Sequence, residues 1–390
     1  MIPYGRQSIN QDDIDAVVEV LQSDFLTQGP KVPEFEQAVI DYVGASYGIA
    51  VNSATSALHL ACLALGVDKG DWVWTSPITF VASANCALYC GAQVDFIDID
   101  PDTYNLSPTA LAAKLEQAKA ESRLPKVVIA VHLSGQSCDM SAIYALAQEY
   151  GFYVIEDASH AIGGSFQGRK IGCCQYSDIT VFSFHPVKVM TTAEGGVAVT
   201  NSESLATRMA LLRGHGITRD QAQITQAPDG PWYYEQIDLG FNYRMTDLQA
   251  ALGLSQLQRL DSFVSQRVEL ARRYNELLAG LPLVLPQQIA DAVDSAWHLY
   301  IVRLRLESLQ LSHREVFEQL RARGIGVNLH YIPVYHQPYY KDDFKVDHFP
   351  VAEAYYASAL SLPLFYDMTA EQQQEVIAVL RSILHDARNE

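Results

Sequence analysis

The chain has 390 residues, of which 49% are hydrophobic, and its 27 basic and 45 acidic side chains give a formal net charge of −18. A chain of this length buries a large core and is expected to form about two domains. The acidity argues against a nucleic acid or an anionic membrane as the partner, because such proteins need a basic face.

Targeting and redox signals indicate a cytoplasmic protein. The first residues have no basic start followed by an apolar stretch, and no apolar run approaches the roughly 20 residues of a membrane span. The cysteines form no CxxC pair and no zinc spacing, so neither a disulfide framework nor a metal site is expected. They are Cys62, Cys86, Cys90, Cys138, Cys173 and Cys174.

The first half of the chain alternates short apolar segments with helical patterns. Two of the helical patterns run over residues 56–65 and 108–120. This alternation predicts a three-layer α/β/α domain with a mostly parallel sheet. The predicted strands are Tyr47–Val51, Trp72–Thr75, Gln93–Ile97, Val127–Val131, Phe152–Ile155 and Ile179–Phe184.

The pattern changes near residue 245, where we place a domain boundary. Residues 246–278 are predicted as one long helix that ends before Gly280. A smaller α+β domain follows, with a strand at 301–304 and helices opened by capping boxes at Ser312 and Thr369. The predicted domains are therefore a large one, 1–245, and a small one, 246–390.

One long stretch between predicted elements, residues 218–236, has no regular pattern. It contains Pro228 and Pro231 around Asp229-Gly230. We expect an exposed loop here.

Lys188 lies in a polar turn just after an apolar strand. Open α/β sheets bind ligands at the carboxyl ends of their strands. A partly desolvated lysine there is nucleophilic and can form an imine with an aldehyde cofactor. A surface lysine after a strand is the alternative, and it is the commoner case for an isolated lysine.

Asp157 ends another apolar strand, and His160 follows it by three residues. A carboxylate beside the ring nitrogen of pyridoxal 5′-phosphate (PLP) keeps that ring protonated, as its chemistry requires. Asp157 is a candidate for this role, with a helix cap as the alternative. His160 is a candidate to bind the ring hydroxyl, or else a packed core histidine.

Four further residues suit a phosphorylated, flat cofactor. Ala54 and Thr55 follow a strand and open a helix, where free N–H groups bind anions. Ser183 adds a hydroxyl. Phe80 follows another strand and could stack on a ring, although core packing is the commoner role of such an aromatic residue.

Taken together, these segments resemble the DegT/DnrJ/EryC1/StrS family of sugar aminotransferases. The likeness runs in order along nearly the whole chain, which makes chance agreement of several segments implausible. The matching segments are residues 52–58, 79–82, 156–160, 182–196, 240–247 and 249–253.

The resemblance implies the type I PLP-dependent transferase fold, like that of aspartate aminotransferase, and assigns roles to residues. Lys188 matches the lysine that binds PLP covalently, and Asp157 matches the acid at the ring nitrogen. His160 matches a residue near the ring hydroxyl that is often glutamine in relatives. Ala54, Thr55 and Ser183 match phosphate contacts. Asn242 matches an asparagine that reaches the phosphate from the neighbouring subunit, which implies a homodimer with shared sites.

The resemblance further implies a reaction. L-glutamate would donate an amino group to C4 of a UDP-linked 4-keto-6-deoxy sugar, as in the formation of UDP-4-amino-4,6-dideoxy-N-acetyl-β-L-altrosamine for pseudaminic acid. Tyr4, Leu26, Thr27, His330 and Tyr331 would then face the sugar nucleotide, or else serve packing. Another nucleotide amino sugar, of the perosamine or 3-amino type, and a non-catalytic regulator with the same fold remain alternatives.

Overall fold

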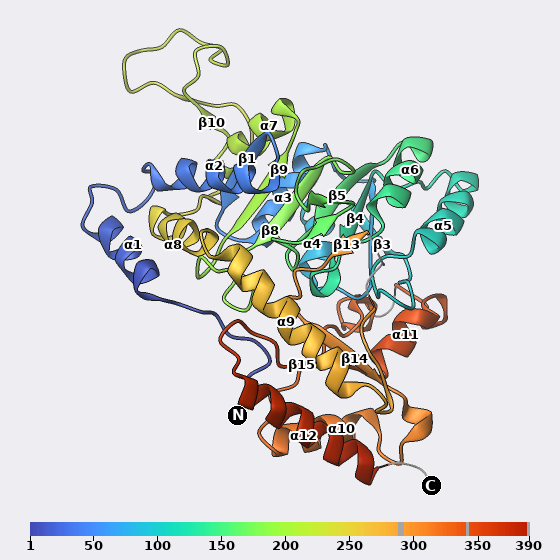
Figure 1. The fold of residues 1–390 in the computed structure, drawn as a ribbon. Helices are drawn as coiled ribbons and strands as arrows, with labels where there is room; N and C mark the ends of the chain where they lie inside the picture. The colour runs from blue at the N-terminus through green and yellow to red at the C-terminus, as the bar shows by residue number, and fades with distance from the viewer. Residues whose placement is uncertain (288–291, 341–342, 388–390) are drawn as a thin grey trace.

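The computed structural model describes residues 1–287, 292–340 and 343–387. A seven-stranded sheet forms the centre of the larger part of the molecule (Figure 1). Its strand order is β1-β9-β8-β5-β4-β2-β3. The strands are β1 (Tyr47–Val51), β2 (Trp72–Thr75), β3 (Gln93–Phe96), β4 (Val127–Val131), β5 (Tyr153–Asp157), β8 (Ile179–Ser183) and β9 (Gly196–Thr200).

The mostly parallel character predicted for this sheet is confirmed. The strands from β3 to β8 pair in parallel, and β9 pairs antiparallel with both β8 and β1. The predicted strands over the first 184 residues are present: β1, β2 and β4 have the predicted bounds, and the ends of β3, β5 and β8 differ by at most two residues. Strand β9 was not among the predicted strands. It places Gly196 opposite Ser183, beside the predicted ligand site.

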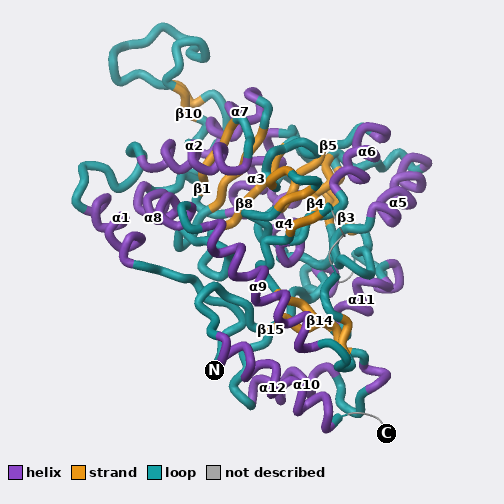
Figure 2. The backbone as a smooth tube through the Cα atoms, in the orientation of Figure 1, coloured by secondary structure: helices purple, strands orange, loops and turns teal. Residues whose placement is uncertain are grey.

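Helices cover both faces of the sheet because alternate strand residues point to opposite sides. On β4, Val127 and Ile129 pack into one core cluster with α3 and α4, while Val128 and Ala130 pack into another with α5 and α6. Figure 2 shows these helices flanking the strands. The bounds are α3 (Ala54–Ala64), α4 (Ala82–Tyr89), α5 (Pro108–Ala120) and α6 (Met140–Tyr150).

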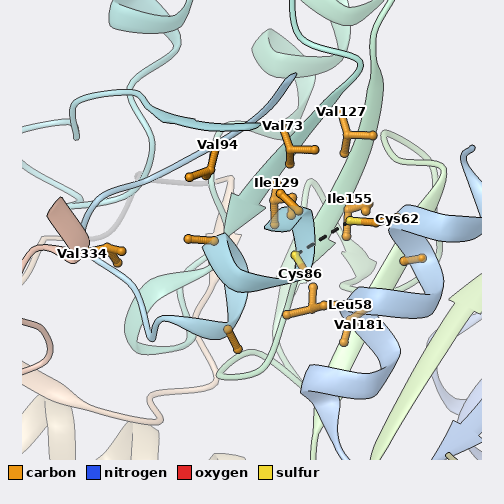
Figure 3. Packing of buried hydrophobic residues seen from close by; sticks show 14 of the residues in the cluster. Leu58, Cys62, Val73, Cys86, Val94, Val127, Ile129, Ile155, Val181 and Val334 are labelled. Atoms are coloured by element: carbon orange, nitrogen blue, oxygen red, sulfur yellow. Dashed lines mark hydrogen bonds between the residues drawn. The ribbon is translucent and has the colours of Figure 1, made fainter. Parts of the chain in front are cut away.

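The first of these clusters joins helices α3 and α4 to the strands beneath them (Figure 3). Leu58 and Cys62 from α3 meet Cys86 from α4, and the Sγ atoms of the two cysteines lie 3.8 Å apart. Ile155 and Val181 from β5 and β8 pack in the same cluster, and both are fully buried. The six cysteines are all free thiols.

The remaining elements of the larger part lie around this framework. The N-terminal helices α1 (Gln11–Leu21) and α2 (Lys31–Val43) pack against α8 (Asp247–Leu257), and α7 (Glu203–Arg213) packs against α3. Short strands β10 (Ile217–Thr218) and β11 (Glu235–Gln236) close the base of a long loop that extends away from the molecule (Figure 1), at the predicted irregular stretch. A small sheet contains β6 (Ser165–Phe166), β7 (Arg169–Lys170) and β13 (Val293–Asp294).

The predicted single helix over residues 246–278 is wrong. The chain instead forms α8 (Asp247–Leu257) and α9 (Leu260–Leu278), separated at Gln258 and Arg259. At the break, the Arg259 backbone leaves the helical conformation, with φ −103° and ψ 2°, and its guanidinium forms an ion pair with the buried carboxylate of Asp13. This contact ties the helix junction to the start of α1.

The C-terminal part has its own sheet and core cluster. Strands β12 (Leu283–Val284), β14 (Tyr300–Leu304) and β15 (Ala359–Leu362) are antiparallel and pack with α9, α10 (His313–Ala322) and α12 (Ala370–Asp386). Capping boxes at Ser312 and Thr369 open α10 and α12, as predicted. Helix α11 (Pro350–Tyr356) precedes β15. In the described residues no helix is long and apolar enough to cross a bilayer.

Ile155 tests the core beneath the site. The Ile155→Ala variant should lower the free energy of unfolding by about 2–5 kcal/mol, because it removes buried methyl groups and leaves a cavity. Urea unfolding at one fixed protein concentration measures the change. Tyr153→Ala on the same strand is the control, since the Tyr153 side chain is exposed and its loss should cost far less. Equal losses in the two variants would contradict this packing.

Candidate active site

Lys188 and Asp157 follow neighbouring strands. Strands β5 and β8 are parallel, with Asp157 opposite Val181, so their carboxyl ends lie at the same edge of the sheet. The turn after β8 is closed by a bond from the Lys188 N–H to the carbonyl of His185, 2.9 Å. Burial lowers the pKa of Lys188 to about 8, and the negative charge of Asp157 partly opposes this shift. The two charges therefore act on one another in a poorly hydrated site.

Three hydrogen bonds orient the Asp157 carboxylate, which is 4% exposed. Oδ2 accepts from Ser83 Oγ at 2.7 Å, and Oδ1 accepts from the N–H and the hydroxyl of Ser159. A carboxylate has about four acceptor directions, so one direction is left for a further donor. Sequence reasoning missed Ser83 and Ser159. Ser83 directly follows the motif that contains Phe80. Its contact with Asp157 could not be predicted, because the two residues lie far apart in sequence.

A candidate anion site lies at the start of α3. The Ser53 side chain caps the helix by accepting from Ser56 N–H, so the N–H groups of Ala54 and Thr55 in the first turn have no intrahelical acceptor. Gly196 packs against this turn so closely that a Cβ there would lie 2.6 Å from Ala54 N. Ser183 pairs with Gly196 across the sheet. The fold thus brings Ala54, Thr55 and Ser183 together in an arrangement that suits a phosphate.

A cluster of buried imidazole rings lies on another side of Lys188. His160 and His298 have ring centroids 4.4 Å apart, and His330 is also buried. Burial and then the nearby Lys188 charge hold the pKa of His330 down at about 3, and the pKa of His160 well below its usual value. These histidines are therefore neutral at physiological pH. His298 was not singled out from the sequence, because nothing near it resembles a motif.

Three of the predicted substrate residues lie beside this cluster. The Tyr331 hydroxyl is 3.1 Å from His160 Nε2, and the Tyr4 ring lies 5.2 Å from the His330 ring between centroids. His330 is fixed by a 2.8 Å bond between its Nδ1 and the Ser361 hydroxyl. The Phe80 ring is 59% exposed and lies 6.4 Å from the Tyr331 ring. These side chains line one wall of the region around Lys188.

Leu26, Thr27 and Asn242 lie at the surface of the protomer instead. Leu26 is 47% exposed, and Thr27 pairs with Thr246 rather than with the cluster. Asn242 is exposed, although Tyr243 next to it accepts a hydrogen bond from Asn52 N–H at the start of the anion site. Within one protomer, no hydrogen bond or ring contact of the described residues joins Leu26 or Thr27 to His330 or Tyr331.

The side chains around Lys188 suit reactions of a carbonyl compound. In the three described stretches, no group of three or more His, Cys, Asp or Glu side chains has the arrangement of a metal site. An amine of lowered pKa, an oriented carboxylate and an anion cradle at one sheet edge can hold a phosphorylated aldehyde and move protons beside it.

Sequence comparisons identify relatives along the whole chain. The model of the DegT/DnrJ/EryC1/StrS aminotransferase family matches residues 7–381. The spore coat polysaccharide biosynthesis protein SpsC of Bacillus subtilis is 40% identical over 389 residues, with 99% of this chain and 98% of that protein covered. The UDP-4-amino-4,6-dideoxy-N-acetyl-β-L-altrosamine transaminase of Campylobacter jejuni is 38% identical over 394 residues, covering 100% and 99%.

A solved structure has the same fold. The putative sugar aminotransferase Spr1654 of Streptococcus pneumoniae, in its PMP-form, superposes with a TM-score of 0.89 at 28% identity, covering 99% of this chain and 100% of that one. The same protein is also known in a PLP-form. The type I PLP-dependent transferase fold predicted for this chain is therefore confirmed.

The lowered pKa of Lys188 can be measured directly. Only a neutral amine is nucleophilic, so the rate of trinitrophenylation at Lys188 should rise with pH and reach half its maximum near 8, not near the ordinary value of 10.5. The cofactor-free protein is treated with trinitrobenzenesulfonate at a series of pH values, and the modified Lys188 peptide is quantified by mass spectrometry.

Denatured protein is the control for this experiment. Its Lys188 is no longer buried, and the half-maximum should return towards the ordinary value. Identical profiles in folded and denatured protein would show that the fold does not desolvate this amine.

Proposed function

The chain belongs to the DegT/DnrJ/EryC1/StrS aminotransferase family, and on that premise we propose that it uses PLP to move an amino group from L-glutamate to C4 of a UDP-linked 4-keto-6-deoxy sugar. The observation that carries the proposal is the convergence of Lys188, Asp157 and the anion cradle at one edge of the sheet. PLP-dependent sugar aminotransferases are the relatives of this chain, so the reaction class rests on family membership as well.

The residues present fit PLP at three points. The free N–H groups of Ala54 and Thr55, with the Ser183 hydroxyl, would bind its phosphate. The unused acceptor direction of Asp157 would bind its ring N–H, and Lys188 would bind its aldehyde covalently. When bound, PLP supplies an electron-withdrawing ring that stabilises negative charge on a neighbouring carbon.

Lys188 has two tasks in this proposal. It would hold the cofactor covalently, and its Nζ, when free, would move a proton from one carbon to the next. A pKa of about 8 suits the second task, because both protonation states of the amine are then populated near neutral pH. An ordinary exposed lysine would be almost fully protonated and a poor base.

Asp157 and the wall of aromatic residues have separate roles in this proposal. Ser83 and Ser159 orient the Asp157 carboxylate, so it is held in place to keep the ring nitrogen protonated. Tyr4, His330 and Tyr331 form an aromatic and neutral wall, which suits the uncharged ring of a keto sugar. We propose that the sugar binds against this wall.

We propose that the enzyme is a homodimer whose sites combine both subunits. Leu26, Thr27 and Asn242 are exposed within the protomer, as expected if they contribute to the site of the partner. Helix α1 supports this proposal, because Ile14, Val18 and Leu21 recur on one face of it and are 40–57% exposed.

The pathway to pseudaminic acid is our proposed context for the reaction. The similarity to the Campylobacter jejuni transaminase supports it, while the equal or higher identity to SpsC favours keeping a different nucleotide amino sugar as the second candidate. The two candidates differ only in the acceptor sugar.

The two half-reactions test the function and the sugar separately. L-glutamate should bleach the visible band of the PLP-loaded enzyme and release 2-oxoglutarate, and the correct keto sugar should restore the band. A panel of UDP- and dTDP-linked 4-keto and 3-keto sugars is then compared, and the UDP-4-keto-6-deoxy-N-acetyl sugar of the altrosamine series should react fastest. Restoration by a dTDP sugar alone would refute the proposed substrate, and the absence of 2-oxoglutarate would refute the transaminase.

Shared sites can be tested with mixed dimers. The Lys188→Ala and Asn242→Asp variants should each be inactive, the second because it places a negative charge against the phosphate. A dimer purified with one subunit of each kind should recover about half of wild-type activity, since one of its two sites keeps both Lys188 and Asn242. No recovery in the mixed dimer would mean that Asn242 serves the site of its own subunit.

A further inference from the structure

Two hydrogen bonds define the protonation state of the His160 ring. The backbone N–H of Ser134 donates to His160 Nδ1 at 3.2 Å, and His160 Nε2 lies 3.1 Å from the Tyr331 hydroxyl oxygen. A backbone N–H can only donate, so Nδ1 presents a lone pair and carries no proton. The state of the other nitrogen then decides how Tyr331 is used.

The other nitrogen must carry the single proton of a neutral ring. His160 is 5% exposed, and burial together with Lys188 and His330 holds its pKa well below the usual value. A neutral imidazole with an unprotonated Nδ1 is protonated at Nε2. His160 Nε2–H therefore donates to the Tyr331 oxygen, and the hydroxyl proton of Tyr331 is left to point elsewhere.

The Ser134 N–H is held in place by the backbone around it. Ser134 lies in a tight turn, Leu133–Gly135, with a φ of 59°. Its carbonyl accepts from Leu299 N–H at 3.2 Å, and the Gly135 carbonyl accepts from Ala296 N–H at 3.0 Å. Gly135 has a φ of 101°, and a Cβ there would lie 2.8 Å from Trp297 N. The turn is thus clamped to the segment that leads into β14.

We propose that Ser134 and His160 are positioning residues that fix the direction of a hydrogen-bond chain, from Ser134 through His160 to Tyr331, so that Tyr331 donates its hydroxyl proton into the site and binds an acceptor oxygen of the ligand. On the proposed function, that oxygen is the phenolate oxygen of the cofactor ring or the carbonyl oxygen of the keto sugar. Both oxygens accept hydrogen bonds. A ligand that offers only a hydrogen-bond donor to Tyr331 would therefore bind more weakly.

The proposed hydrogen-bond chain predicts which side chains can replace His160. Glutamine has one acceptor and one donor at its end, as the neutral ring does, so it can accept from Ser134 and donate to Tyr331. Glutamate offers only acceptors, so Tyr331 would turn its proton towards residue 160 and be lost to the ligand. Glutamine and glutamate have nearly the same shape, so this pair of variants separates hydrogen-bond direction from packing.

The first measurement needs no cofactor. In ¹⁵N-histidine spectra of the cofactor-free protein, the signals lost in His160→Gln belong to His160. They should show a protonated Nε2 and an unprotonated Nδ1 across neutral pH. A protonated Nδ1, or a doubly protonated ring, would overturn the proposal. Because PLP is absent, this result stands or falls independently of the proposed function.

The second measurement compares the variants as binders. The dissociation constant of PLP, or the KM of the keto sugar, should be at least about tenfold lower for His160→Gln than for His160→Glu. This factor is the size of one lost hydrogen bond. His160→Leu neither donates to Tyr331 nor accepts from it, so it should fall between these two variants, and equal values for His160→Gln and His160→Glu would overturn the proposal. Melting curves and circular dichroism exclude variants that do not fold.

Tyr331→Phe identifies the source of the oxygen. If the cofactor supplies it, the dissociation constant of PLP rises about tenfold and the absorption spectrum of the loaded enzyme shifts. If the keto sugar supplies it, PLP binding is preserved and the KM of the sugar half-reaction rises instead. A variant unchanged in all three readouts would overturn the proposal, whereas a wild-type protein that binds no PLP would refute the proposed function alone.

Discussion

The parallel pairing of β5 and β8 is the constraint on which the rest of the site depends. Because adjacent parallel strands end at the same edge of a sheet, this pairing brings Asp157 and the turn with Lys188 together although 31 positions separate them in sequence. The antiparallel strand β9 then places Gly196 opposite Ser183 and against the start of α3. One sheet edge thus contains an amine, a carboxylate and an anion cradle.

Burial gives this edge its chemistry. The chain is strongly acidic overall, yet the surroundings of Lys188 are a carboxylate held by serines and neutral histidines. Removing water from the amine lowers its pKa, and the same effect keeps the His160 and His330 rings uncharged. Local geometry therefore sets the charge state of the site, and the net charge of the chain does not.

Features that depend on local sequence patterns, such as strands and helix caps, could be predicted from the sequence. Features that depend on contacts between residues far apart in the sequence could not. The apolar segments were sufficient to predict the strand that ends with Asp157 and the strand that precedes Lys188, and the capping pattern at Thr369 predicted the start of the last helix. The break between α8 and α9 leaves no trace in the apolar pattern, and the Arg259 side chain there pairs with Asp13, far away in sequence. Ser83, Ser134 and His298 were missed for the same reason, since each acts through a residue far away in sequence and belongs to no motif of its own.

The predicted substrate residues divide in an informative way. Tyr4, His330 and Tyr331 meet beside the histidine cluster within one protomer, whereas Leu26, Thr27 and Asn242 lie at its surface. A single chain thus brings Lys188 and Asp157 together but holds only part of the predicted substrate contacts beside them. This division underlies the proposal that a second subunit completes the site.

The central claim is that an amine at position 188 binds the aldehyde of a cofactor whose ring nitrogen meets Asp157. The most direct test is to load the purified protein with PLP, reduce it with borohydride and map the modified peptide by mass spectrometry. The account predicts a visible band that borohydride abolishes and one stable adduct on Lys188. A protein that stays colourless, or an adduct confined to other lysines, would contradict it.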